Sequence, residues 1–177
     1  MLIGKSVYLR AMESDDIKLI VKWRNDPEVN KHFYEYAPLS HDQQADWWVK
    51  QRGRDDQFNW MICANEDKAP LGTVSIYDID LRNRKAEWGR FYLVGDVRGK
   101  GYGRDVENLI HEYVFNHLNL NKLYCEVFAD NAIVVNLHKK FGYKQDGLLR
   151  QHVFRHGEYN DVVALSLLKE EWVPGGN

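Results

Sequence analysis

Apolar residues in this chain gather in short runs separated by polar turns, and this pattern predicts a series of β-strands. The turns fall at residues 65–68, 82–84 and 156–157, and Gly95 with Asp96 ends another run. The predicted strands are residues 7–12, 58–64, 71–79, 85–94, 122–128, 151–155 and 159–168.

Other segments carry apolar residues at the helical spacing of three and four. The clearest is the segment from Gly103 onward, where Val106, Leu109, Ile110 and Tyr113 keep this rhythm. Residues 14–25 form another predicted helix with Ser14 as its N-cap, and Ser40 with Gln43 forms a capping-box pattern for a helix through Trp47 and Trp48. A fourth helix is predicted over residues 131–141 and ends at Gly142.

The order of these elements predicts the fold class. One strand and two helices precede a three-strand meander, followed by a helix, a strand, a helix and a hairpin. The sequence therefore indicates a mixed α/β fold, and the antiparallel meander excludes a simple doubly wound sheet. A chain of 177 residues suits one domain, which we place at residues 1–172 with a flexible tail at 173–177.

Composition narrows the class of protein. A hydrophobic content of 44% and an aromatic content of 13% are typical of a globular chain, and a net charge of -2 argues against binding to nucleic acid through overall charge. No long apolar run or charged N-terminal leader is evident, so we expect no membrane association and a cytoplasmic location. Cys63 and Cys125 lie in apolar strand-like runs and are expected to be buried and reduced.

The most informative segment is the basic glycine-rich stretch at residues 98–104, R-G-K-G-Y-G-R. It follows a predicted strand and leads into a predicted helix. Glycines allow a tight turn and a close approach of backbone to ligand, while a helix N-terminus favours an anion. The segment therefore predicts a phosphate-binding loop; a glycine turn with solvated arginines is the alternative.

Two motifs in this order resemble the GCN5-related N-acetyltransferases (GNAT). Residues 98–103, following W-G-R-F-Y-L-V at 88–94, are similar to motif A of that family, and residues 131–143 are similar to motif B. The opening Y-L-R at 8–10 and the closing G-E-Y-N-D-V at 157–162 resemble the branch that contains the RimJ/RimL type and spermidine acetyltransferase. W-R-N-D-P at 23–27 resembles enzymes acting on nucleotide-linked amino sugars.

The resemblance implies a GNAT fold, with a central mixed but mostly antiparallel sheet that splays at a β-bulge and is flanked by helices. It also implies acetyl-CoA as co-substrate. The strand before the loop would pair with the pantetheine arm, the loop amides would hold the pyrophosphate, and two asparagines would contact the cofactor. The cofactor-binding residues implied are Phe91, Tyr92, Leu93, Val94, Arg98, Gly99, Lys100, Gly101, Tyr102, Gly103, Arg104, Asn131 and Asn136.

Two residues are candidates for proton transfer. His138 stands where the family usually has a tyrosine, the commonly proposed acid for the CoA thiolate, and its spacing with Leu137 and Phe141 places it on an inward helical face. A packed core histidine is the alternative. Glu87 lies where related enzymes often carry an acid that draws a proton from the amine or attracts a cation; an exposed carboxylate paired with Lys85 or Arg90 is the alternative.

The acceptor is expected to meet the aromatic segment after the first predicted helix. Its candidate substrate residues are Phe33, Tyr34, Glu35 and Tyr36. Aromatic faces and carboxylates suit a cationic amine. Packing of these aromatics between the helices and the sheet is the alternative. The histidines show no metal-ligand spacing, so no metal is expected.

The resemblance predicts that the protein is an N-acetyltransferase. Its expected acceptor is the primary amine of a small molecule, either a polyamine or a nucleotide-linked amino sugar, which attacks acetyl-CoA directly in a ternary complex. A ribosomal-protein or peptide N-terminal acetyltransferase and a non-catalytic CoA-binding module are the alternatives. A homodimer or a higher homo-oligomer is left open.

Overall fold

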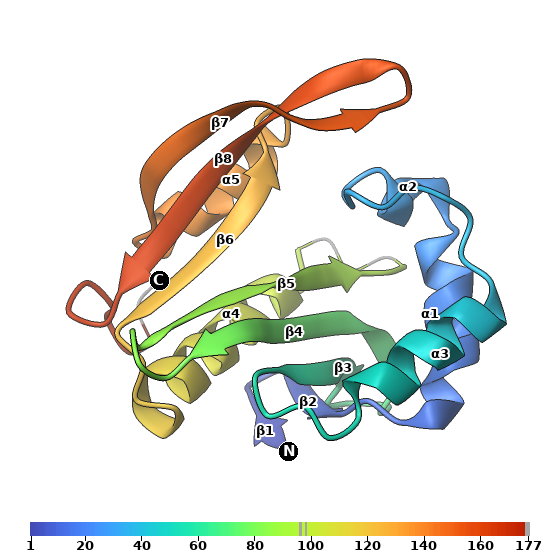
Figure 1. Ribbon diagram of the computed structural model, residues 1–177. Helices are drawn as coiled ribbons and strands as arrows, with labels where there is room; N and C mark the ends of the chain where they lie inside the picture. The colour runs from blue at the N-terminus through green and yellow to red at the C-terminus, as the bar shows by residue number, and fades with distance from the viewer. Residues whose placement is uncertain (96, 98, 176–177) are drawn as a thin grey trace. The chain divides into compact units, whose positions relative to one another are not determined.

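The computed structural model describes residues 1–95, 97 and 99–175. Within these residues eight strands are hydrogen-bonded in the order β1-β2-β3-β4-β5-β6-β8-β7, and helices stand between them in the chain (Figure 1). The elements are β1 (Leu2–Ile3), β2 (Val7–Ala11), the 3-10 turn η1 (Ser14–Asp16), α1 (Ile17–Arg24), α2 (Pro27–Asn30), α3 (His41–Gln51), β3 (Phe58–Ala64), β4 (Pro70–Asp80), β5 (Lys85–Leu93), α4 (Tyr102–Glu112), the π-helical turn η2 (Tyr113–His117), β6 (Lys122–Phe128), α5 (Ala132–Lys140), β7 (Lys144–Arg155) and β8 (Glu158–Leu168).

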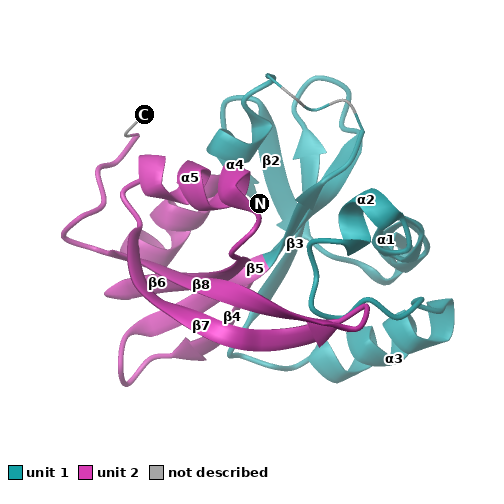
Figure 2. Cartoon of the chain, turned by 90° about the horizontal axis from the view of Figure 1, so that it is seen from above, with its two compact units in different colours: residues 1–75, 90–106 teal, residues 76–89, 107–177 magenta. Residues whose placement is uncertain are grey.

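The chain divides into two compact units, and β4, β5 and α4 contribute to both (Figure 2). Unit 1 contains residues 1–75 and 90–106, and unit 2 contains residues 76–89 and 107–177.

Unit 1 is built on antiparallel strands covered by short helices. β2 pairs with β1 and β3, with Leu9 opposite Ile62. The apolar face of α1 repeats at a spacing of three residues, through Ile17, Ile20 and Trp23, because a helix returns to the same face after about one turn. The core that these elements bury consists of Met12, Ile20, Trp23, Val29, Met61, Cys63 and Tyr92.

Unit 2 contains the C-terminal strands. β6 pairs antiparallel with β8 along its length, and β7 pairs antiparallel with β8. Along β6, Leu123, Cys125 and Val127 are buried, which is the period of two that a half-buried strand requires. The parallel register between β5 and β6 runs from Lys85 opposite Lys122 to Glu87 opposite Tyr124, whereas both strands continue further.

The predicted fold class is confirmed: the sheet is mixed and mostly antiparallel, with helices flanking it. The strand predicted at 122–128 and the Ser40–Gln43 capping box are present as predicted, with the Gln43 N–H donating to Ser40 Oγ at 3.1 Å. The single domain over residues 1–172 stays a prediction, as does the tail, whose residues 176 and 177 lie outside the described part.

Several local features differ from the sequence prediction, among them the short helix α2, which was not predicted. β1 was not predicted, because it has two residues. Lys144–Arg155 is one strand, of which only the last part was predicted. The helix begun at residue 14 opens with a 3-10 turn, and the helix after the glycine loop ends in the π-helical turn Tyr113–His117. In the latter, the widened turn leaves Val114 and Phe115 both fully buried.

Candidate active site

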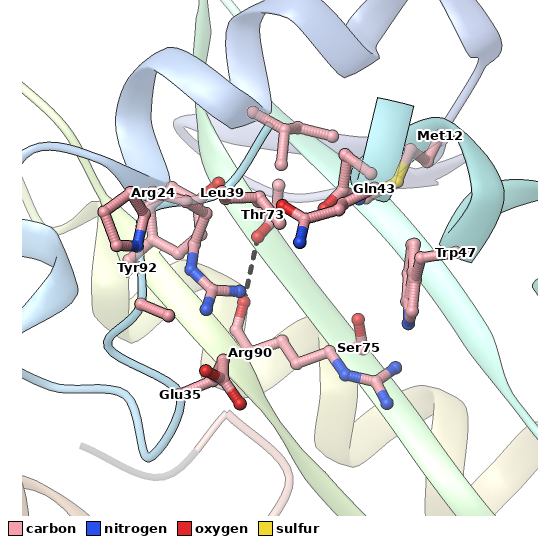
Figure 3. Close-up of a pocket in the computed structure, with 14 residues that line it drawn as sticks. Met12, Arg24, Glu35, Leu39, Gln43, Trp47, Thr73, Ser75, Arg90 and Tyr92 are labelled. Carbon is pink, nitrogen blue, oxygen red and sulfur yellow. Dashed lines mark hydrogen bonds between the residues drawn. The ribbon is translucent and has the colours of Figure 1, made fainter. Parts of the chain in front are cut away.

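Unit 1 contains a pocket of about 370 Å³ (Figure 3). Helices α1 and α3, the segment after α2, and strands β4 and β5 supply its walls. The residues that line it are Met12, Ile20, Arg24, Glu35, Ala37, Pro38, Leu39, Gln43, Gln44, Trp47, Thr73, Ser75, Arg90 and Tyr92.

Two guanidinium groups and one carboxylate give this pocket its charge. Arg24, at the end of α1, stacks over the ring of Phe33 at 3.8 Å and points toward Glu35 in Figure 3. Its Nε atom is buried and has no hydrogen-bond partner among the described residues. Burial lowers the pKa of Arg24 from its ordinary value, and the positive charge of Arg90 acts in the same direction.

Arg90 on β5 contacts two polar side chains, Asn59 on β3 and Gln57 just before that strand. Its Nη1 atom lies 3.2 Å from Asn59 Oδ1 and 3.4 Å from Gln57 Oε1, and its guanidinium lies 5.3 Å from the Trp47 ring centroid. Asn59 also accepts a hydrogen bond from Ser75 at 2.7 Å. The Arg90 side chain is therefore held in one position at the pocket wall.

The C-terminal end of β5 contains residues that the resemblance assigns to cofactor binding. Tyr92 turns its ring into the core of unit 1, where it meets Trp23 and Phe33 edge-on with centroid distances of 6.1 and 5.6 Å. Burial raises the pKa of Tyr92 to about 12. The side chains of Phe91, Leu93 and Val94 are half-buried.

The glycine-rich loop has the backbone conformation that its glycines predict. Gly99 and Gly101 have φ values of 74° and 75°, and a Cβ atom on either would find open space out to 4 Å. Gly103 belongs to α4, whose first turn is closed by the Asp105 N–H donating to Gly101 O at 3.1 Å. Open space beside a left-handed backbone at a helix start suits a phosphate group. Lys100, Tyr102 and Arg104 flank these glycines, whereas Arg98 lies outside the described residues.

Glu87 is held in unit 2 by a tyrosine on the neighbouring strand. The Tyr77 hydroxyl donates to Glu87 Oε1 at 2.9 Å. Gly89 permits this arrangement, because a Cβ atom there would lie 2.7 Å from the Tyr77 hydroxyl oxygen. The sequence suggests Lys85 or Arg90 as a partner of Glu87, and the structure adds Tyr77.

His138 lies in the core of unit 2, as its helical face predicts. Only 4% of the residue is exposed, and its Nδ1 atom lies 2.8 Å from Oε1 of the buried Glu107. The rings of Trp88 and Tyr143 lie 5.3 and 5.1 Å from the imidazole, centroid to centroid. The partner of His138 is thus a carboxylate on α4, which the sequence motifs do not single out.

The two asparagines assigned to the cofactor differ in their surroundings. Asn131 is the N-cap of α5, and its Oδ1 atom accepts from the Val134 N–H at 3.4 Å. Asn136 is exposed on the same helix. A cap oxygen is engaged by the helix itself, so cofactor contact by Asn131 would use its amide nitrogen or its backbone.

The four predicted substrate residues separate into three groups. Glu35 lines the pocket. Phe33 contacts Arg24 and Tyr92, which line the pocket, but is not itself a lining residue. Tyr34 and Tyr36 are 40% and 42% exposed. The structure adds Arg24, Arg90 and Trp47 to the pocket. In the sequence, Arg24 falls in the motif at 23–27, Arg90 in the stretch at 88–94 and Trp47 in a predicted helix, and none of the three was singled out for the acceptor.

The two cysteines are both free and buried, as predicted. Among residues 1–95, 97 and 99–175, no group of three or more His, Cys, Asp or Glu side chains is arranged to hold a metal ion. Over the same residues, no helix is both long and apolar enough to span a membrane.

Residues 6–144 match the Acetyltransferase (GNAT) domain family. The chain belongs to this family. The resemblance seen in the two sequence motifs is therefore confirmed, and the protein is an acetyltransferase. The roles of individual residues within the site stay predictions.

The chain is similar to spermidine acetyltransferases of two bacteria. Spermidine N(1)-acetyltransferase of Vibrio cholerae is 27% identical over 171 residues, which cover 97% of this chain and 98% of that protein. The Escherichia coli (strain K12) enzyme of the same name is 24% identical, covering 95% and 89%. The crystal structure of the Vibrio cholerae spermidine N-acetyltransferase in complex with CoA and spermine has a TM-score of 0.87 at 26% identity, covering 93% of this chain and 96% of that chain.

Proposed function

We propose that this protein transfers the acetyl group of acetyl-CoA to a primary amine of a small molecule, with a polyamine as the first acceptor to test. The observation that carries this proposal is the likeness, along nearly the whole chain, to a spermidine acetyltransferase whose structure holds CoA and spermine. Transfer takes place by direct attack of the amine in a ternary complex, so no nucleophilic cysteine or serine is needed.

The residues of the glycine loop and β5 fit the co-substrate. Acetyl-CoA supplies an activated thioester, whose carbonyl oxygen gains charge as the amine attacks and whose thiolate then departs. The left-handed Gly99 and Gly101 leave room for phosphate oxygens beside the start of α4, and Lys100 and Arg104 add positive charge. Phe91, Tyr92, Leu93 and Val94 offer backbone groups to the pantetheine arm.

Two proton-transfer roles remain proposals based on the resemblance. Glu87, with its carboxylate fixed by Tyr77, draws the proton from the acceptor amine through water or attracts the cationic amine. His138 protonates the departing thiolate, directly or through water, in the position where the family usually carries tyrosine. Both residues lie in unit 2, and each already has a fixed side-chain partner.

An acceptor that carries an anionic group beside its amine is the second candidate. Among the described residues, two guanidinium groups and only one carboxylate line the pocket of unit 1, and the buried Nε atom of Arg24 has no partner there. A polycation gains nothing from two arginines, whereas a phosphate or carboxylate accepts hydrogen bonds from both. A nucleotide-linked amino sugar belongs to this class.

Release of free thiol from acetyl-CoA tests these proposals directly. The acceptor panel contains spermidine and spermine, a nucleotide-linked amino sugar, and a ribosomal peptide with a free N-terminus. We expect turnover with a small-molecule amine and a kcat/KM that is far lower for the peptide. Preference for the peptide would favour N-terminal acetylation. Binding of acetyl-CoA without turnover on any acceptor would indicate a non-catalytic module and overturn the proposal.

A further inference from the structure

The core of unit 2 contains a contact between a carboxyl group and an imidazole that the resemblance to the family does not account for. Glu107 on α4 and His138 on α5 approach to 2.8 Å between Oε1 and Nδ1, and their side chains are 0% and 5% exposed. Removing a carboxylate from water is costly unless a partner compensates. The second oxygen, Oε2, has no hydrogen-bond partner among the described residues. His138 is therefore the main compensation that Glu107 receives.

The contact decides which imidazole nitrogen remains for chemistry. Nδ1 is committed to Glu107, so Nε2 is the ring nitrogen left to face another group. When the pair holds a single proton on Nδ1, Nε2 is an acceptor. When the pair holds two protons, Nε2 carries one of them, whether the other resides on Nδ1 or on the carboxyl group. The proton count of the pair thus sets the donor state of Nε2.

The titratable groups that pack around Glu107 and His138 among the described residues keep a constant charge, so only the pair itself changes its protonation. On α4, burial lowers the pKa of His111 to about 3, and its Nε2 atom lies 3.0 Å from the Tyr143 hydroxyl. Burial raises the pKa of Tyr143 and of Cys125 on β6 well above their ordinary values. Trp88 on β5, which meets the imidazole edge-on, does not titrate. These neighbours stay neutral at physiological pH.

The pKa of the Glu107 carboxyl follows two opposing causes. Burial raises the pKa above its ordinary value, although the hydrogen bond and charge of His138 oppose that rise. A carboxylate within contact distance likewise favours the charged form of an imidazole. Protonation of one group is consequently coupled to protonation of the other.

We propose that Glu107 is a positioning residue that fixes the His138 ring through Nδ1 and keeps a proton available at Nε2. This inference rests on the proposed acetyl transfer, in which His138 protonates the CoA thiolate. Proton balance is simple: the N–H bond at Nε2 breaks, an S–H bond forms on CoA, and the pair regains a proton from the acceptor amine through solvent. A phenol needs no such partner to hold a proton at neutral pH, whereas an imidazole does.

Glu107→Gln is the decisive substitution, because it keeps the size of the side chain and an oxygen facing Nδ1 but removes the charge. Glu112→Gln is the matched control on the same helix, since Glu112 is exposed and bonds the exposed Asn116 side chain in a contact of 2.9 Å. Glu107→Asp retains the charge on a shorter stem, and serves if the glutamine variant does not fold.

The first readout is independent of activity. Nuclear magnetic resonance of the folded, histidine-labelled protein gives the titration midpoint of His138, whose signal is assigned by its loss in His138→Tyr. We expect Glu107→Gln to lower this midpoint by about one pH unit or more, and Glu112→Gln to leave it in place. Glu107→Asp should lie between the two. An unchanged midpoint in Glu107→Gln would overturn the positioning role.

The second readout is turnover against pH. Because the donor form of Nε2 is lost as pH rises through the apparent pKa of the pair, kcat should fall on the alkaline side at a lower pH in Glu107→Gln, with the KM for acetyl-CoA unchanged. The same substitution made in His138→Tyr should leave the pH profile unaltered. A shifted midpoint with an unshifted kcat profile would overturn the link to thiolate protonation. Lack of turnover by the wild type would instead refute the proposed function, while the titration still tests the pair.

Discussion

Asp105 accepts hydrogen bonds from both the backbone N–H and the hydroxyl of Ser6, at 2.7 and 3.1 Å. The same carboxylate accepts from the backbone N–H groups of Val7 at 3.0 Å and Lys5 at 3.1 Å. Asp105 lies in the first turn of α4, nearly one hundred residues away in the chain but in the same unit. Asp105 in the first turn of α4 therefore anchors the segment that leads into β2.

Asp105→Asn should destabilise unit 1, because the amide turns an N–H₂ group toward donors that need an acceptor. We expect a loss of about 2 kcal/mol, seen in urea or thermal unfolding, whereas the exposed Asp55→Asn should have little effect. Burial alone would raise the pKa of Asp105, but the bonds from Ser6, Val7 and Lys5 bring it below its ordinary value. Its stabilisation is therefore complete above a pH of about 4 and is lost as pH falls through the lowered folded-state pKa. A difference between wild type and variant that persists far below that pH would contradict this assignment.

The glycine loop offers a matched pair of substitutions. Gly101 has a φ of 75°, which a β-branched residue adopts only at a cost, whereas Gly103 lies within α4, where a Cβ atom would lie 4.0 Å from Cζ of Phe91. Gly101→Val should weaken acetyl-CoA binding at least about ten-fold in calorimetry, because the loop must rearrange. Gly103→Ala should leave the fold intact and stabilise the helix slightly. Equal affinity in wild type and Gly101→Val would remove the phosphate-loop assignment.

Sequence patterns predicted those elements whose ends are fixed by interactions between residues close together in the chain. Ser40 and Gln43 exchange hydrogen bonds within one helical turn, so their spacing alone identifies the start of α3. Strand β7 was predicted only in part, because most of its residues are exposed and little alternation marks them. Its strand structure comes from pairing with β8, which the sequence of β7 does not encode locally.

The parts of the candidate site that could be predicted are the glycine loop and the residues whose position on a helix face follows from their spacing. His138 was placed on a buried face from its spacing, and this is where it lies. Glu107 was missed, although it lies three residues before Ile110 on the same buried face, where a polar residue in an apolar row is a signal worth testing. Arg24 was missed because a half-buried arginine at a helix end has the same sequence pattern as a solvated one.

Gly72 is required by a close backbone approach between β4 and β5 within unit 1. A Cβ atom at this position would overlap the Tyr92 carbonyl oxygen, which is backbone and cannot move independently. Gly72→Ala should therefore cost about 3 kcal/mol or more in denaturant unfolding. Gly147→Ala is the control, since a Cβ atom there meets nothing within 4 Å. Similar stability of the two variants would show that β5 does not approach Gly72 so closely.

Arg24→Gln separates the two classes of acceptor. If the acceptor carries an anionic group that binds in the pocket, loss of this guanidinium should raise the KM for that acceptor about ten-fold or more with kcat nearly unchanged. For a polyamine, the same substitution should leave KM unchanged or lower it, because one repulsive charge is removed. Arg52→Gln changes an exposed arginine of the same unit and serves as the control. A fall in kcat alone for both acceptors would mean that Arg24 supports the pocket structure rather than binding substrate.

Glu87 and Tyr77 allow the roles of base and charge to be distinguished. Glu87→Gln should reduce acetylation at least about ten-fold near neutral pH, where most of the acceptor amine is protonated and a base is needed. The deficit should shrink as pH rises, because more amine is then already neutral. Tyr77→Phe removes the 2.9 Å hydrogen bond but leaves the carboxylate, so it should lower the rate less and keep the same direction of pH dependence. Initial rates of thiol release across a pH range from about 6 to about 10, at saturating acetyl-CoA, measure both effects. An equal deficit at every pH in Glu87→Gln would instead assign Glu87 to recognition of the cationic amine, because attraction between charges does not depend on removing the proton.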